Sequence, residues 1–195
     1  MNNNIKFGIY TSFYNCERFI DKIFTSIEDL NYDNFEWHIT DDYSGDNTKN
    51  LILERLDKSP LKHKIIYYVQ SEKKQMYWKP NEFFDETFDW IILVDADDDF
   101  DKNFLNVYNI FLYGKDDISF VSSDCFKIYE ETKSLHSISY LLNDDIISNK
   151  IKRYHPSCDY LNNISYSCFG LLRGFKNIIP SFDVDDMLSC AEDSY

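Results

Sequence analysis

One apolar run in this chain stops abruptly in a cluster of carboxylates. The run is Trp90–Val94, and the cluster that follows it is Asp95-Ala96-Asp97-Asp98-Asp99. The run is too short to cross a membrane and is rich in β-branched residues, so it predicts a fully buried strand. Ligands of open α/β sheets bind beyond the carboxyl ends of the strands, which is where this cluster stands.

The four aspartates of this cluster repel one another unless a positive charge lies among them. Carboxylate oxygens suit a hard cation such as Mg²⁺ or Mn²⁺, bound together with a phosphate-bearing ligand. The alternative is a solvated acidic turn, because short motifs often match by chance. A calcium-binding EF-hand loop beginning at Asp95 is excluded, since Phe100 and Asn106 stand where that loop needs Gly and Glu.

The first hundred residues alternate between predicted strands and predicted helices. Strands are predicted over 5–10, 35–40, 64–69 and 90–94, helices over 17–30 and 51–56, and a further helix near Pro80. A turn is predicted over 11–15. Such alternation predicts a parallel sheet with right-handed helical crossovers, and therefore an α/β fold.

The pattern loosens after Asp99. A helix is predicted over 104–112, strands over 118–121 and 166–172, and the start of a helix near Asp183. The first of these strands is expected to continue toward 125–129. The stretch 130–163 has weak periodicity and predicts long loops with short helical pieces.

Composition narrows the class of protein. The 195 residues are 44% hydrophobic, which predicts one globular domain. The net charge of −14 argues against nucleic acid as a partner but not against a nucleotide, whose charge a bound metal neutralises. The five cysteines form no C-x-x-C pair and predict buried free thiols. With no membrane-length apolar run and no signal-peptide pattern at Met1–Asn4, we expect a cytoplasmic protein, peripheral attachment to a membrane remaining open.

A second acidic pair, Asp41-Asp42, follows the strand predicted over 35–40, and both acidic loops are expected at one edge of the sheet. At this point the chain resembles family 2 glycosyltransferases with the GT-A fold. The resemblance rests on four blocks in the right order, which are Phe13-Tyr14-Asn15, the run 35–48, the D-x-D motif in Val94–Asp98, and a last block of Gly170–Arg173, Phe182-Asp183 and Glu192-Asp193. It covers almost the whole chain.

The resemblance implies a GT-A (Rossmann-like) fold with a mostly parallel central sheet flanked by helices. One domain would span 1–195, with a nucleotide-sugar half over about 1–100 and a looser acceptor-side half over about 101–195, cut short at the C-terminus. It also implies an inverting, metal-dependent transfer of a sugar from a UDP-linked donor to a hydroxyl group of a glycan, lipid or protein.

The resemblance assigns a role to each of seven residues. Thr11 and Tyr14 would line the nucleotide pocket, and Asp41 would accept a hydrogen bond from the base. Asp95 would contact the ribose or the water shell of the metal, and Asp97 would ligate Mn²⁺ or Mg²⁺. Lys79 would lie by the donor diphosphate, and Asp193, beside Glu192, would be the catalytic base. Asp98 and Asp99 receive no role.

Three departures from the family pattern stand out. Lys79 occupies the place of an Arg, Tyr43 replaces the usual Gly of the second acidic loop, and the chain stops two residues after Asp193. An inactive truncated glycosyltransferase, or a module that only binds nucleotide sugars, therefore remains the alternative. A nucleotidyltransferase ranks third, because it needs a Gly-rich phosphate loop with a basic residue, which Thr11–Asn15 does not provide. The sugar, the acceptor, the linkage and the oligomeric state are not identified by the sequence.

Overall fold

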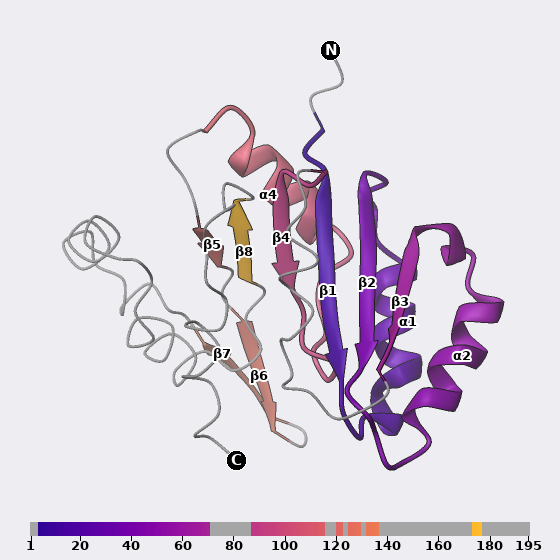
Figure 1. Ribbon diagram of the computed structural model, residues 1–195. Helices are drawn as coiled ribbons and strands as arrows, with labels where there is room; N and C mark the ends of the chain where they lie inside the picture. Colours follow the sequence, from indigo (N-terminus) through magenta and orange to yellow (C-terminus); the bar gives the residue numbers. More distant parts are fainter. Residues whose placement is uncertain are drawn as a thin grey trace, which may run out of the picture. The chain divides into compact units, whose positions relative to one another are not determined.

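The computed structural model describes residues 4–70, 87–115, 120–122, 125–129, 132–136 and 173–176. In chain order the elements are β1 (Phe7–Phe13), α1 (Ile20–Glu28), β2 (Phe35–Asp41), α2 (Thr48–Lys58), β3 (Ile65–Val69), β4 (Trp90–Leu93), α4 (Phe104–Leu112), β5 (Phe120–Ser122), β6 (Cys125–Tyr129), β7 (Thr132–His136) and β8 (Arg173–Lys176) (Figure 1). Short 3-10 turns at Glu17–Phe19 and Lys62–Lys64 precede α1 and β3.

Six strands form one sheet in the order β3-β2-β1-β4-β8-β5 (Figure 1). β1 pairs in parallel with β2 and with β4, and β2 pairs in parallel with β3. β8 is antiparallel to β4. Four adjacent parallel strands with helices between them in the sequence confirm the predicted α/β fold with a mostly parallel sheet.

One face of the parallel sheet is covered by α1 and α2 (Figure 1). α1 presents Ile20, Ile23, Phe24 and Ile27, all buried, as its spacing in the sequence predicted. The Phe24 ring meets the indole of Trp37 edge to face, with 4.7 Å between the ring centroids. Burial of each such side chain contributes about 1.5–3 kcal/mol, so this layer holds α1 against the sheet.

The chain divides into two compact units. Residues 1–121 and 172–179 form the first, and residues 122–171 and 180–195 form the second. In the second unit β6 and β7 pair as an antiparallel hairpin, with Cys125 opposite His136 and Tyr129 opposite Thr132. The long loops predicted over 130–163 are therefore wrong for 132–136. The prediction of one domain with a boundary near residue 100 stays a prediction.

Two other boundaries differ from those expected. Thr11, Ser12 and Phe13 were predicted as a turn but belong to β1, because each pairs with a residue of β2. β8 begins at Arg173, next to the strand predicted over 166–172. That stretch lies outside the described residues, as do the helix expected near Pro80 and the C-terminal helix.

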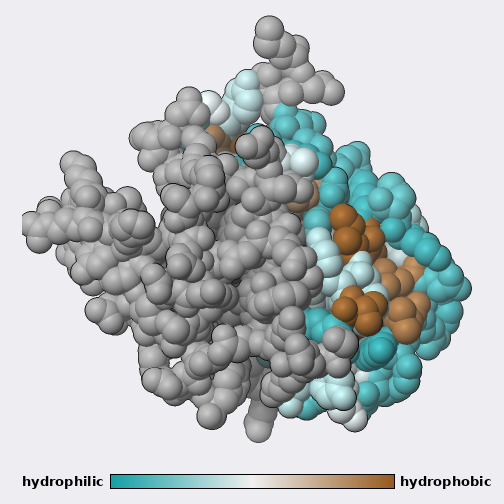
Figure 2. Space-filling view, viewed as in Figure 1, coloured by the Kyte–Doolittle hydropathy of each residue, from teal (hydrophilic) through white to brown (hydrophobic). Residues whose placement is uncertain are grey.

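The strand β3 forms one edge of the sheet. Its Ile66 and Val69 are exposed, and Figure 2 shows apolar side chains gathered on that side of the molecule within a hydrophilic rim. Within the part of the chain that the structure describes, no helix is both long enough and apolar enough to cross a membrane.

Candidate functional site

The carboxyl ends of β1, β2 and β4 reach the same edge of the sheet, because these strands run parallel. Phe13 at the end of β1 is opposite Asp41 at the end of β2. On the other side of β1, Tyr10 is opposite Leu93, and the backbone N–H of Val94 still donates to the Tyr10 carbonyl at 3.0 Å. The loops that follow these three strands therefore open side by side.

The loops after β1 and β2 are joined by hydrogen bonds between them. The backbone N–H of Asn15 donates to Ser44 Oγ at 2.9 Å, and the Gly45 N–H donates to Asn15 Oδ1 at 2.8 Å. The Cys16 N–H donates to Thr48 Oγ1, also at 2.8 Å. Because both loops contribute donors and acceptors, neither can shift without breaking bonds to the other.

Asp46 stands at the centre of this junction. Its Oδ2 accepts from the Glu17 N–H at 3.2 Å, and its Oδ1 accepts from the Thr48 N–H at 3.0 Å. Partial burial is the largest influence on the pKa of Asp46 and raises it, but hydrogen bonds from Thr48 and Glu17 outweigh burial and leave that pKa below its usual value. Asp46 is therefore held as a carboxylate just before Asn47, the N-cap of α2, and it ties the start of that helix to the loop after β1.

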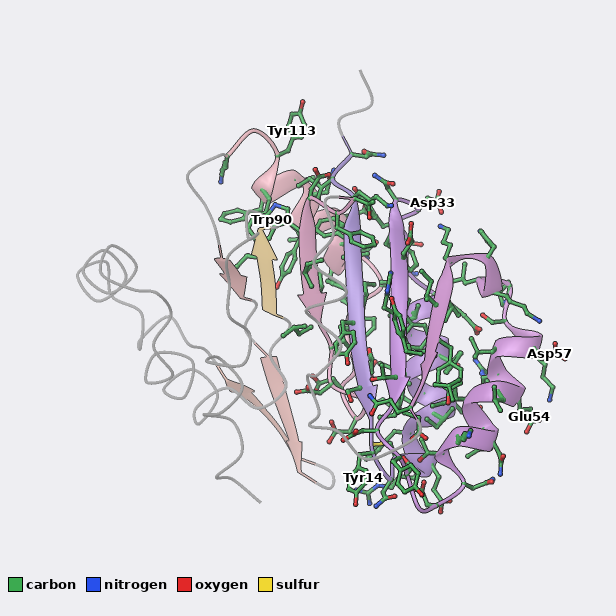
Figure 3. The ribbon with its side chains drawn as sticks, viewed as in Figure 1. Tyr14, Asp33, Glu54, Asp57, Trp90 and Tyr113 are labelled. Atoms are coloured by element: carbon green, nitrogen blue, oxygen red, sulfur yellow. The ribbon has the colours of Figure 1, made fainter. Side chains whose placement is uncertain are left out.

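Two of the residues predicted in the nucleotide pocket lie on β1 and just after it. Thr11 is fully buried, and its Oγ1 accepts a hydrogen bond from Trp37 Nε1 at 3.0 Å. Tyr14 follows the strand with 42% of its surface exposed. Figure 3 shows Tyr14 at the opposite edge of the sheet from Trp90, the first residue of β4. Of the two side chains, that of Tyr14 is the one that an incoming ligand can reach.

The acidic pair after β2 is buried at the strand end. Asp41 is 5% exposed and Asp42 3% exposed. Asp41 Oδ1 accepts from the Ser44 N–H at 3.3 Å, and the Asp42 N–H donates to the Phe13 carbonyl at 2.8 Å. Burial, with a smaller contribution from the charge of Asp41, raises the pKa of Tyr67 on β3 to about 12. The Asp41 carboxylate thus lies within electrostatic reach of β3.

The acidic run after β4 separates into different environments. Asp95 is partly buried and Asp97 is exposed. The Asp98 N–H donates to the Asp95 carbonyl at 3.2 Å, which turns the chain. Asp99 instead faces α1, where its carboxylate accepts from Ser26 Oγ at 3.2 Å and lies 3.5 Å from Lys22 Nζ.

Cys16 links the loop after β1 to the loop after β4. Burial chiefly raises the pKa of its thiol, and the negative charges of Asp97 and Asp46 raise it further. The Sγ also donates a hydrogen bond of 3.1 Å to the Tyr14 carbonyl. Asp97 is therefore close enough for its charge to act in the junction between the first two loops. The thiol is half-buried, and the predicted free state is confirmed for this cysteine.

The side chains present suit a metal that a substrate helps to bind. Among the residues that the structure describes, no three His, Cys, Asp or Glu side chains gather as a complete metal site. Mg²⁺ in substrate complexes is held by one or two carboxylates, and phosphate oxygens complete its coordination. Asp95 and Asp97 supply carboxylates of that kind at the end of β4.

The structure thus brings five of the seven predicted residues to one edge, namely Thr11, Tyr14, Asp41, Asp95 and Asp97. Lys79 and Asp193 lie outside the described residues, as does Glu192. The sequence did not reveal the bonds from Asn15 and Asp46 that join the loops. The only signal for them was a run of cap-forming residues at 46–48.

The family to which this architecture belongs is decided by a family model. The model described as glycosyl transferase family 2 matches residues 9–175. The chain belongs to glycosyl transferase family 2. The matched span of this glycosyltransferase domain runs from β1 to β8 and includes both acidic loops. The resemblance seen in the sequence is confirmed. Among curated proteins, none matches the chain.

Solved structures of other proteins are similar to part of this glycosyltransferase domain. The mannosyltransferase PcManGT from Pyrobaculum calidifontis, in complex with GDP-Man and Mn²⁺, is 16% identical with a TM-score of 0.53, covering 60% of this chain and 34% of that one. S. aureus TarS 1-349 is 22% identical with a TM-score of 0.47, covering 55% and 32%. The complex of TarS 1-349 with UDP-GlcNAc is 20% identical with a TM-score of 0.48, covering 55% of this chain and 31% of that one. The chain spans about a third of the length of these proteins.

Proposed function

We propose that this domain transfers a sugar from a UDP-linked donor to a hydroxyl acceptor with the help of Mn²⁺ or Mg²⁺. The observation that carries the proposal is the arrangement at the carboxyl edge, where a buried carboxylate at the end of β2 and a partly buried and an exposed carboxylate after β4 flank the end of β1. Membership of family 2 supports the reaction class. The complexes of PcManGT and TarS with nucleotide sugars support the donor class.

The donor would lie across the strand ends with its base near β2. Asp41 would accept a hydrogen bond from the base, while Tyr14 would border the nucleotide. β2 and β4 are both neighbours of β1, so their ends are about 10 Å apart at the usual strand spacing. A nucleoside diphosphate can bridge that distance, so the base and the diphosphate can meet the two acidic loops at once.

The carboxylates after β4 would act at the diphosphate. Asp97 would ligate the cation, and Asp95 would contact the ribose or the water shell of the cation. The cation held in this way would stabilise the charge that develops on the leaving diphosphate. Lys79 would add a positive charge near the phosphates, although it lacks the two-pronged geometry of an arginine.

Asp193 would act on the acceptor. A hydroxyl group is a poor nucleophile, so a carboxylate beside it must take its proton as the bond to the sugar forms. Attack from the face opposite the leaving diphosphate inverts the anomeric carbon. The acceptor is proposed as a hydroxyl group on a glycan, lipid or protein.

The test is a transfer and hydrolysis assay over a panel of UDP-sugars and GDP-mannose, with Mn²⁺ and with chelator. Metal-dependent turnover of one donor is expected, and binding without turnover under any metal would favour the module that only binds nucleotide sugars. Asp97→Asn should abolish Mn²⁺-dependent UDP binding in calorimetry. Asp99→Asn is the matched control from the same loop and should retain binding, because Asp99 faces Lys22 and Ser26. Unchanged UDP affinity in Asp97→Asn would remove Asp97 as the metal ligand.

A further inference from the structure

Tyr43, in the loop after β2, has a left-handed backbone with φ of +64°. Asn15, in the loop after β1, has φ of +50°, which is less unusual because Asn tolerates this region. For a bulky residue such as tyrosine the conformation is a genuine outlier. Strain of this kind persists only where the surroundings impose it, and it concentrates at functional sites.

Hydrogen bonds on both sides impose the conformation of Tyr43. Asp41 lies two residues before Tyr43, and Ser44 directly follows it. The Ser44 N–H donates a hydrogen bond to Asp41 Oδ1 and so closes the chain around Tyr43. Ser44 Oγ and the Gly45 N–H are in turn bonded to Asn15. The backbone at position 43 is therefore held in the left-handed region by the same bonds that join the loops after β1 and β2.

The strain at Tyr43 brings little burial in return. The side chain remains 59% exposed, so its ring contributes little to the hydrophobic core. A glycine at this position would adopt the same backbone without strain. Since folding alone favours another residue here, the exposed ring points to a function outside the folding of the loop.

Tyr43 and Tyr14 lie in neighbouring loops that are joined by hydrogen bonds. The Asp42 N–H donates to the Phe13 carbonyl and the Asn15 N–H donates to Ser44 Oγ, so positions 14 and 43 lie between two cross-loop bonds. Both tyrosines are substantially exposed, and they follow the ends of two strands whose residues Phe13 and Asp41 are opposite each other in the sheet. Two aromatic residues and one acceptor thus gather at the end of β2.

We propose that Tyr43 stacks on the nucleobase of the donor, a role that rests on the proposed function above. The flat face of a tyrosine ring binds any base through stacking, whereas Asp41 reads only the donor groups on the base edge. Tyr43 therefore contributes affinity, and Asp41 contributes selectivity. The left-handed backbone at this position carries a cost that ligand binding would offset.

The test compares Tyr43→Asn, Tyr43→Phe and Tyr113→Ala by calorimetry with UDP and with GDP, each in the presence of Mn²⁺. Asn keeps the left-handed backbone and removes the ring, so nucleotide binding should weaken by about tenfold. Phe keeps the ring and should bind within about twofold of the unchanged protein. Tyr113 is an equally exposed tyrosine at the opposite edge of the sheet, and its loss should leave binding unchanged (Figure 3).

Unfolding by urea separates binding from stability. Tyr43→Asn should be at least as stable as the unchanged protein, because the strain is relieved, while its nucleotide affinity falls. Equal affinity in Tyr43→Asn and the unchanged protein would overturn this inference and leave the proposed function intact. If Tyr43→Asn lowers the free energy of unfolding by as much as it lowers the free energy of nucleotide binding, this inference is also overturned, because Tyr43 would then act on the folding of the loop. If the unchanged protein binds neither nucleotide with Mn²⁺, the proposed function fails and this role of Tyr43 fails with it.

Discussion

Replacing Asp46 should loosen the junction on which the whole carboxyl edge depends. Asp46→Ala removes the acceptor for the backbone N–H groups of Glu17 and Thr48, which lie 3.2 and 3.0 Å from its two oxygens. Asp46 precedes Asn47, the N-cap of α2, and each of its two hydrogen bonds contributes about 0.5–1.5 kcal/mol. The bond to Glu17 joins two loops, but the site is partly solvated. We therefore expect Asp46→Ala to lower the free energy of unfolding by about 1–2 kcal/mol in total. For a chain of this size, that lowers the unfolding midpoint by about 2–8 °C.

The pH dependence of this effect has a definite sign. The pKa of Asp46 lies below its usual value of 3.8 in the folded protein, because its hydrogen bonds outweigh burial. A carboxyl group whose pKa is lower in the folded than in the unfolded protein stabilises the fold. This contribution is complete above the pKa of the unfolded state and is lost as the pH falls through the pKa of the folded state. Asp46→Asn cannot titrate, so the stability difference between it and the unchanged protein should be constant above about pH 5 and shrink below about pH 4.

Urea unfolding, followed by tryptophan fluorescence at several pH values from 7 down to 3, measures this difference. Asp57→Asn is the control, because Asp57 makes only an exposed ion pair with Lys62. A difference between the unchanged protein and Asp46→Asn that stays constant down to pH 3, or grows, would refute the reasoning. So would a destabilisation in Asp46→Ala no larger than that in the control.

Three further changes test the core and the proposed chemistry. Thr11→Val should cost about 1–3 kcal/mol in urea unfolding, because it leaves the buried Trp37 N–H without its acceptor, while Thr11→Ser should cost less. Glu28→Ala should cost about 1–2 kcal/mol in the same assay, because Glu28 accepts from Arg55 at 2.9 Å and from Ser59 at 2.6 Å; an unchanged midpoint would show that these bonds add nothing to the packing of α1 on α2. Asp193→Asn should keep donor affinity in calorimetry and stop transfer, and undiminished transfer would remove it as the base.

The parallel sheet was predictable because its signals are local. Strands β3 and β4 are short apolar runs, and α1 places its four apolar residues on one face. Patterns of this kind state which side of an element is buried, and the order of elements then limits the topology. The acidic loops followed from the same reasoning, since their position after parallel strands fixed their edge of the sheet.

Features that depend on pairing between distant segments were not predictable. Thr11–Phe13 is too polar at Thr11 and Ser12 to suggest a strand, yet it continues β1 because β2 provides partners as far as Asp41. β7 is a different case, because it pairs with the adjacent strand β6 in a hairpin, and its polar sequence Thr132–His136 has no apolar pattern that would predict a strand. Sequence periodicity records burial, and these residues owe their conformation to hydrogen bonds instead.

The junction at the site shows the same division. Asp46, Asn47 and Thr48 were recognisable as residues that begin a helix, and Asp46 does bond to the Thr48 N–H. Its second bond, to Glu17 of a loop 29 residues earlier, has no local signal. The replacement of glycine by tyrosine at position 43 was visible, but its backbone conformation followed only from the bonds between Ser44 and Asn15.

The four carboxylates of the acidic run after β4 have different surroundings, and this difference narrows where the proposed cation would bind. The Asp99 carboxylate faces α1, where it accepts a hydrogen bond from Ser26 and lies beside the ammonium group of Lys22. Lys22 therefore balances one of the four negative charges of the run. The turn closed by the Asp98 N–H on the Asp95 carbonyl then orders the backbone between them. Asp97 remains exposed at the tip, and its charge reaches Cys16 in the loop after β1. Because Lys22 already balances the charge of Asp99, the proposed cation would be needed only at the end of the run nearest the strand, where the phosphates of a donor would complete its coordination.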